Sequence, residues 1–178
     1  EIQKMSNLLA EGMSAGAFGM TTGLEYTPGR YANQNELDAL AKVVGQYDGL
    51  IMSHMRTENN ATMDSDLAEL FSQGKYANIQ VSHMKVVYGK GKERAKEILT
   101  LLNQQRDESS FSVSADVYPY LASYTTIGIL FPEYALAPND YEIVRQNRRN
   151  DLLDYVRDKV NRRNGPEATL FGTKPYKG

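Results

Sequence analysis

Two short apolar runs decide the fold of this 178-residue chain. They are GLIMSH, residues 49–54, and NIQVSH, residues 78–83, and each continues with a methionine and a basic residue. Each run has the length of a β-strand and is followed by a polar loop and then by a helical pattern of apolar residues. The two copies are offset by 29 residues, from position 54 to position 83, which is close to the length of one βαβ unit.

The rest of the chain extends this alternation in both directions. Strands are expected at residues 17–22 and 111–118, on either side of the two runs. The apolar periodicity predicts helices over residues 2–13, from about Asn35, which can cap its own start, over residues 63–74, and after the loop at residues 89–91. Strands separated by helices imply a parallel sheet with right-handed crossovers, so the fold class is α/β.

Four βα units fit two architectures. One is a small open α/β domain, and the other is about half of a TIM-like (β/α)8 barrel, which takes roughly 250 residues when complete. Half a barrel predicts an open sheet edge that the rest of the barrel or a homo-oligomer would cover. The alternation lapses after about residue 125, and a long charged helix is expected at residues 140–163. We therefore expect the βα units over residues 1–135 and a helical extension over residues 136–178.

Composition excludes several classes of protein. The chain has 20 basic and 22 acidic residues, so it offers no basic stripe for nucleic acid. No apolar run approaches the ~20 residues that span a membrane, and the absence of cysteine removes disulfides and thiolate ligands. The first residue, Glu1, lies inside a helical pattern and is not a methionine, which suggests a segment of a longer protein.

The chain has two histidines, His54 and His83, and each ends one of the two strand-like runs. Functional sites of parallel sheets lie at the carboxyl ends of the strands. Neighbouring strands are about 4.8 Å apart, so the two imidazoles could converge on one metal ion. The alternative is that both histidines are structural, as they would be in a non-catalytic α/β binding module.

Further candidates surround the histidines in the sequence. Alternation along a strand would place Arg56 with His54 and Lys85 with His83, where the two cations could bind a substrate carboxylate. Tyr118 is a candidate at the end of the fourth strand. Asp116 could be a metal ligand, an acceptor for a histidine N–H, or a structural cap, and the second of these is the preferred interpretation.

Four segments together resemble the N-acyl-D-amino-acid deacylases (D-aminoacylases) of the amidohydrolase superfamily. They are GAFGMTTGLEYTPG at residues 16–29, SHMR at 53–56, SHMK at 82–85 and DVYPY at 116–120, and the resemblance covers roughly residues 5–135. It implies a distorted TIM barrel with a small β-domain, and a zinc-dependent hydrolase that cleaves the amide bond of an N-acyl-D-amino acid. It also implies that His54 and His83 are zinc ligands and that Arg56, Lys85 and Tyr118 contact the substrate carboxylate. Zinc would polarise the acyl carbonyl and activate the attacking water.

The resemblance also implies what this chain lacks. The family's His-x-His pair would precede Glu1, its catalytic aspartate would follow Gly178, and its cysteine ligand has no counterpart here. The chain therefore corresponds to a central segment, no catalytic acid or base is assigned within it, and the isolated segment is expected to be inactive. A cyclic amidohydrolase of the dihydroorotase or hydantoinase type is the alternative within the enzyme class.

Overall fold

The computed structural model describes residues 1–172, which divide into two compact units. The first unit runs from Glu1 to Tyr118 and the second begins at Pro119. The helices and strands of the first unit are, in chain order, α1 (Ile2–Ser14), β1 (Gly19–Gly23), α2 (Gln34–Gln46), β2 (Leu50–His54), α3 (Met63–Gln73), β3 (Asn78–Val81), α4 (Gly91–Glu108) and β4 (Val113–Ala115).

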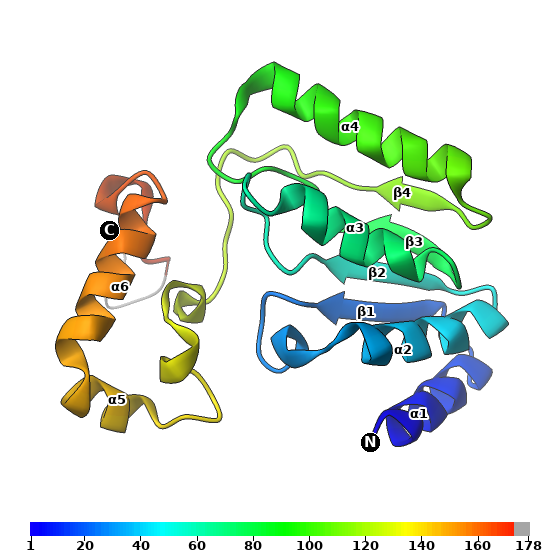
Figure 1. Ribbon diagram of the computed structural model, residues 1–178, viewed down its shortest axis with the longest axis horizontal. Coiled ribbons are helices and arrows are strands. Elements are labelled where there is room, and N and C mark those ends of the chain that lie inside the picture. The colour runs from blue at the N-terminus through cyan, green and yellow to red at the C-terminus, as the bar shows by residue number, and fades with distance from the viewer. Residues whose placement is uncertain (173–178) are drawn as a thin grey trace. The chain divides into compact units, whose positions relative to one another are not determined.

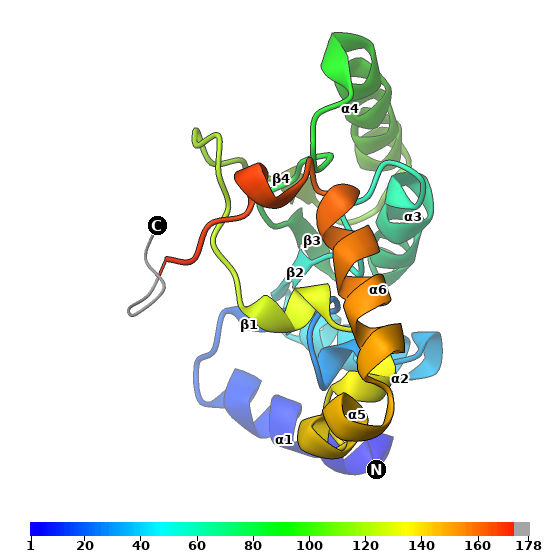
Figure 2. The ribbon, with the colours of Figure 1, turned by 90° about the vertical axis from the view of Figure 1, so that its left-hand side faces the viewer.

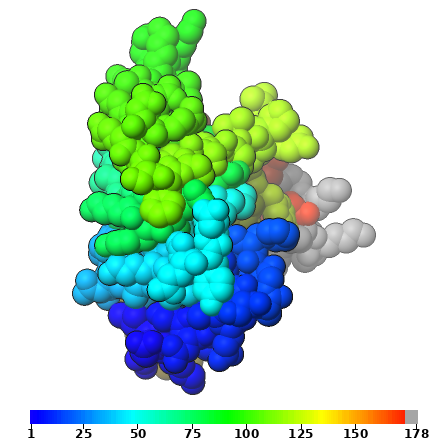
Figure 3. Space-filling view, turned by 90° about the vertical axis from the view of Figure 1, so that its right-hand side faces the viewer, coloured from blue at the N-terminus to red at the C-terminus, as the bar shows by residue number. Residues whose placement is uncertain are grey.

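The four strands form one parallel sheet in the order β1-β2-β3-β4. Strands and helices alternate as the sequence predicts, so the expected βα architecture is confirmed. Helices α2, α3 and α4 lie on one face of the sheet, which Figures 1 and 2 show from two directions. Figure 3 views the end at which the strands begin, and there the segments of this unit follow one another in chain order from blue to green. Within residues 1–172, no helix is both long and apolar enough to cross a membrane.

Side-chain alternation along the strands separates a buried face from an open one. Ile51 and Ser53 of β2 and Ile79 and Val81 of β3 are fully buried beneath the helices. The intervening residues point to the other face and are half-buried. The core between sheet and helices also contains Met13, Ala41, Val44, Met55, Met63, Leu67, Leu70, Phe71, Ala77, Ile98, Leu102 and Val113.

One residue of each strand belongs to a row across the open face, and three of the four are polar. The register aligns Thr21, Met52, Gln80 and Ser114, and the Ser114 hydroxyl donates to Gln80 Oε1 at 2.9 Å. Within the first unit no helix covers this face, in contrast to the face beneath α2, α3 and α4. A four-stranded parallel sheet covered on one side is the geometry of part of a (β/α)8 barrel, whose strands turn their other face toward the barrel interior.

Two details of the helices differ from the sequence-based expectation. Helix α2 is capped by Asn33, whose side chain accepts from the Glu36 N–H at 3.1 Å, so the cap lies two residues before the expected Asn35. The single long helix expected over residues 140–163 is two helices, α5 (Tyr141–Asn147) and α6 (Arg149–Asn161). The break lies at Arg148, whose φ of −131° is outside the helical range.

The second unit consists of α5, α6 and short 3-10 turns at Ile127–Leu130, Glu133–Ala135 and Pro166–Ala168. It begins at Pro119, earlier than the boundary at residue 135 that the sequence suggested. Where the functional domains of a longer protein divide stays a prediction.

Gln73, the last residue of α3, is fully buried, and its amide has no hydrogen-bond partner among the described residues. A buried amide without partners costs about 1–3 kcal/mol. We therefore expect Gln73→Met, which keeps the length of the side chain, to raise the melting temperature of the protein in calorimetry. A lower melting temperature would mean that a part of the protein outside residues 1–172, or a bound water, hydrogen-bonds to this amide.

Candidate metal centre at the carboxyl ends of the strands

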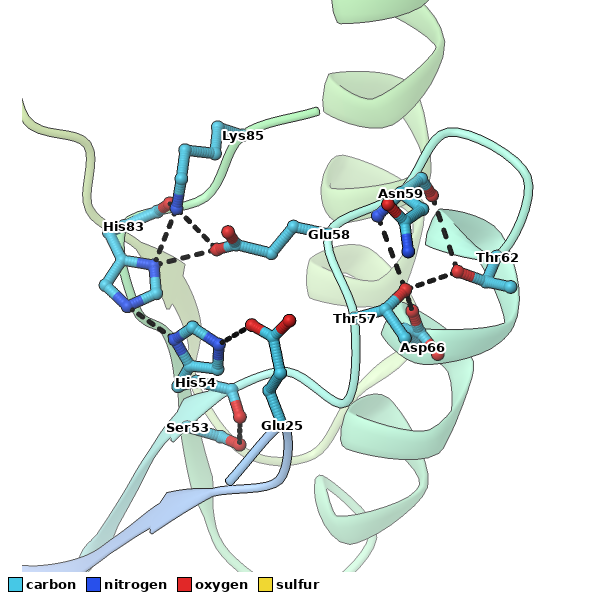
Figure 4. Close-up of polar contacts among 10 residues, drawn as sticks. All are labelled: Glu25, Ser53, His54, Thr57, Glu58, Asn59, Thr62, Asp66, His83 and Lys85. Atoms are coloured by element: carbon cyan, nitrogen blue, oxygen red, sulfur yellow. Dashed lines mark hydrogen bonds and ion pairs between the residues drawn. The ribbon is translucent and has the colours of Figure 1, made fainter. Parts of the chain in front are cut away.

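The rings of His54 and His83 face each other at the carboxyl ends of β2 and β3. Nδ1 of His54 lies 2.9 Å from Nε2 of His83, and the ring centroids are 4.6 Å apart in an edge-to-face arrangement (Figure 4). The expected convergence of the two rings is confirmed. Both side chains are largely shielded from solvent, with 14% of His54 and 29% of His83 exposed.

A turn at the end of β3 brings His83 to this position. The sheet pairs Ser53 with Val81, an offset of 28 residues, whereas the sequence repeat has an offset of 29. A slip of one residue in an extended strand would turn the His83 side chain to the opposite face. The strand instead ends at Val81, and His83 adopts a left-handed backbone conformation with φ of +37°, so its ring returns toward His54.

Each histidine has a carboxylate at its other ring nitrogen. Glu25 Oε2 lies 3.0 Å from His54 Nε2, and Glu58 Oε1 lies 3.0 Å from His83 Nδ1 (Figure 4). Lys85 Nζ donates to Glu58 Oε1 at 2.5 Å and lies 3.2 Å from His83 Nδ1. The five side chains form a continuous line of contacts that runs from Glu25 through the two rings to Glu58 and Lys85.

Two tyrosines border the histidine pair. The Tyr26 ring lies 4.9 Å from the His54 ring, and the Tyr118 ring lies 6.3 Å from the His83 ring. Lys85 Nζ lies 5.1 Å from the centroid of the Tyr118 ring, within the range of a cation–π interaction. The structure thus brings Lys85 and Tyr118 together beside His83, and their contact with a substrate carboxylate stays a prediction.

Arg56 is directed elsewhere. β2 ends at His54 and the chain bends at Arg56, so the alternation of side chains does not continue to this residue. Its guanidinium forms a fork on Glu69 of α3, with distances of 2.8 Å from Nη2 and 3.0 Å from Nε, and donates to the carbonyls of Arg30 and Ala32. The hydrogen bonds to Glu69 raise the pKa of Arg56 above its ordinary value. Binding of a substrate carboxylate by Arg56 stays a prediction.

Asp116 stabilises the turn that carries His83. Its Oδ1 accepts the backbone N–H of His83 at 2.8 Å and its Oδ2 accepts from the Gln80 amide at 2.7 Å. Burial alone would raise the pKa of Asp116, but these two hydrogen bonds outweigh it and lower the pKa below its ordinary value. The preferred interpretation of Asp116 is corrected in one respect, because the N–H that it accepts belongs to the backbone of His83.

The arrangement of donors suits a cation between the two rings. If Glu25 and Glu58 each accept the N–H of the ring that they face, the two inner nitrogens both carry lone pairs. Two lone pairs 2.9 Å apart repel unless a proton or a metal ion lies between them. Two nitrogens bound to one tetrahedral zinc ion are about 3.3 Å apart, so a small opening of the pair admits the metal. His54, Glu58 and His83 also offer ligand atoms that all lie within 4.8 Å of one another.

The sequence did not single out Glu25, Glu58 or Tyr26 as members of this site. Glu25 and Tyr26 follow β1 inside the GLEYTPG segment, and Glu58 lies in the loop after β2. One signal was available, because all three lie directly beyond the carboxyl ends of strands, where sites of parallel sheets are built.

Comparisons with known proteins agree with this geometry. No family model matches the chain. The chain is 36% identical over 146 residues to an N-acyl-D-glutamate deacylase of Alcaligenes xylosoxydans xylosoxydans, an alignment that covers 80% of this chain and 29% of that enzyme. It is 32% identical over 129 residues to a D-aminoacylase of the same organism, covering 71% of this chain and 26% of that enzyme.

Solved structures show the same relationship. An N-acyl-D-glutamate deacylase from Bordetella bronchiseptica, in complex with zinc and a phosphonate inhibitor, matches with a TM-score of 0.62 and 31% identity over 67% of this chain and 25% of that one. A D-aminoacylase described as defining a subset of amidohydrolases matches with a TM-score of 0.63 and 31% identity over 68% of this chain and 26% of that one. The chain spans between 25% and 29% of the length of these relatives. By sequence, strand order and fold, it belongs to the N-acyl-D-amino-acid deacylase (D-aminoacylase) family of amidohydrolases.

Proposed function

We propose that this chain contributes the metal-binding histidines to a zinc-dependent hydrolase that cleaves the amide bond of N-acyl-D-amino acids. The observation that carries the proposal is the histidine pair, with inner nitrogens 2.9 Å apart and a carboxylate beside each outer nitrogen. Family membership supports the choice of reaction, because the relatives are named as deacylases and one was solved with zinc.

His54 and His83 would hold the ion, and their neutral imidazole nitrogens suit zinc. When bound, zinc supplies a Lewis acid for the acyl carbonyl and lowers the pKa of water. The chain's own residues shield the place of reaction, since the Tyr26 and Tyr118 rings border the two imidazoles. No general acid or base is assigned among the described residues, and two secure ligands fall short of the usual three protein ligands of catalytic zinc.

Lys85 and Tyr118 are the residues of this chain best placed for the substrate carboxylate. The Lys85 ammonium lies beside His83 and over the Tyr118 ring, so an anion that approaches the metal ion would meet its charge. Glu58 neutralises Lys85 in the structure described here, and a substrate carboxylate would share the ammonium with it. Arg56 would join this group only if its fork on Glu69 opened.

The open face of the sheet needs a cover in the whole protein. The row of Thr21, Met52, Gln80 and Ser114 has no helix over it within the first unit. We propose that the remaining strands of a (β/α)8 barrel close around this face, with a second copy of the chain as the alternative cover.

The test is an assay of the longer protein that contains this chain. We expect it to hydrolyse N-acetyl-D-amino acids in preference to their L enantiomers, to lose activity after chelation and to regain it with Zn²⁺. The 178-residue chain alone is the control, and we expect no turnover from it because it holds two secure ligands and no assigned base. Full activity after exhaustive metal removal would refute the zinc-dependent reaction.

A further inference from the structure

Both histidines show the same arrangement of contacts although they come from different strands. In each ring one nitrogen faces the other histidine, and the opposite nitrogen faces a glutamate at 3.0 Å (Figure 4). The inner nitrogens are Nδ1 of His54 and Nε2 of His83, so the rings use opposite atoms for the same purpose. The chain thus has to select a different tautomer at each histidine to present two lone pairs inward.

The backbone that follows β1 positions Glu25. The Leu24 N–H donates to the His54 carbonyl at 3.0 Å, which extends the pairing of β1 with β2 beyond the end of the strand. The Leu24 side chain is buried, with 2% of its surface exposed. The Tyr26 ring packs 4.9 Å from the His54 ring on the other side. Glu25 is thereby held between two anchored residues, with its carboxylate at His54 Nε2.

Glu58 is the more buried of the two carboxylates, with only 7% of its side chain exposed. Its backbone carbonyl accepts the Val87 N–H at 3.0 Å, which joins the loops that follow β2 and β3. A buried carboxylate is costly unless it is paired, and the Lys85 ammonium at 2.5 Å supplies the pairing. The charged carboxylate can therefore remain in place beside His83 Nδ1.

A carboxylate only accepts hydrogen bonds when ionised, so it favours the tautomer in which the nitrogen that it faces carries the hydrogen. Glu25 favours Nε2–H at His54, and Glu58 favours Nδ1–H at His83. Lys85 has the opposite preference, because its ammonium can donate to His83 Nδ1 only when that nitrogen carries no hydrogen. The carboxylate is the closer of the two to Nδ1, at 3.0 Å against 3.2 Å for the ammonium, and a lone pair on Nδ1 would point at its negative charge. Lys85 keeps two further acceptors, Glu58 and the His83 carbonyl, when Nδ1 carries the hydrogen.

We propose that Glu25 and Glu58 are positioning residues that fix the tautomers and orientations of His54 and His83, so that Nδ1 of the first and Nε2 of the second bind the metal. The inference rests on the zinc function proposed above and assigns Glu58 a contact with a histidine and not with the ion. Carboxylates that hold the outer nitrogen of a metal-binding histidine increase its basicity and restrict its rotation.

The test uses the longer protein and measures metal affinity. We expect Glu25→Gln and Glu58→Gln each to weaken zinc binding by about 10–100-fold in competition with a chelating indicator. The absorption spectrum of the Co²⁺-substituted protein should keep its shape in both variants, because the atoms that bind the metal are unchanged. The matched control is Glu93→Gln, which removes an exposed carboxylate paired with Lys96 on α4 and should change neither measurement.

Two results would overturn the inference. If both glutamine variants bind zinc as tightly as the wild-type protein does, the carboxylates do not support the histidines. The proposed zinc function would stand in that case, because the wild-type protein would still bind zinc and be active. A change in the Co²⁺ spectrum that reports a lost ligand in Glu58→Gln would make Glu58 a ligand. Failure of the wild-type protein to bind zinc at all would instead overturn the proposed function.

Discussion

Replacing either His54 or His83 by alanine in the longer protein should abolish stoichiometric zinc binding and lower kcat/KM for an N-acetyl-D-amino acid by at least about 10³-fold. The size follows from the role of the metal, which stabilises charge in the transition state by several kcal/mol, and each 1.36 kcal/mol is about a factor of ten in rate. Each histidine supplies one of the two inner nitrogens, which lie 2.9 Å apart, so either substitution removes one of the two expected metal ligands. Elemental analysis after dialysis gives the zinc content, and steady-state kinetics gives kcat/KM.

Met84→Leu is the matched control for this experiment. Met84 is adjacent to His83 and packs against the core, so a conservative change there tests whether disturbance of the turn alone removes the metal. We expect near-normal zinc content and activity in this variant. Retention of zinc and activity in His83→Ala would mean that His83 is structural and that other residues hold the metal.

The order and type of the elements were accessible from the sequence because they depend on local periodicity. The short apolar runs in 49–54 and 78–83, each followed by a polar loop, predict strands, and the structure buries Ile51 and Ile79 on the face beneath the helices. The sequence predicted that His54 ends a strand, and the structure adds that it lies on the open face between two buried neighbours, Ser53 and Met55. Local patterns did not reveal the break at Arg148, because Arg148 and its charged neighbours Arg145 and Arg149 all favour a helix.

The details of the site depend on contacts between loops, which no periodicity encodes. The repeat in the sequence has an offset of 29 but the sheet register has an offset of 28, and only the left-handed turn at His83 reconciles the two. Asp116 directly follows β4, 33 residues after His83, and its carboxylate holds the backbone of that turn. Glu25 and Glu58 could be assigned to the rings only after the loops had been placed beside them.

Arg56→Ala should destabilise the protein and lower kcat/KM by a similar factor, up to about 10²-fold, for substrates with and without a free carboxylate. The guanidinium joins the carbonyls of Arg30 and Ala32, in the loop between β1 and α2, to Glu69 of α3. The same loop contains Glu25, which lies beside His54. Small displacements of groups near a reacting centre can cost about a hundredfold in rate. We expect the lost hydrogen bonds to lower the free energy of unfolding by about 1–3 kcal/mol. The loss is not larger because the ion pair with Glu69 is partly exposed.

The comparison that decides the role of Arg56 uses an N-acetyl-D-amino acid and the same compound with its carboxylate amidated. Arg94→Ala is the matched control, since Arg94 also joins a loop residue, Asn60, to helix carboxylates, and these hydrogen bonds do not include a histidine.

Arg56→Lys should recover little, because a lysine cannot reproduce the planar fork on Glu69 and reach both carbonyls. A loss confined to the substrate with a free carboxylate would contradict the scaffold role and support the direct contact that the sequence predicted. Arg56 would then have to leave Glu69 when substrate binds, so Glu69→Gln, which weakens that fork, should tighten binding of the same substrate.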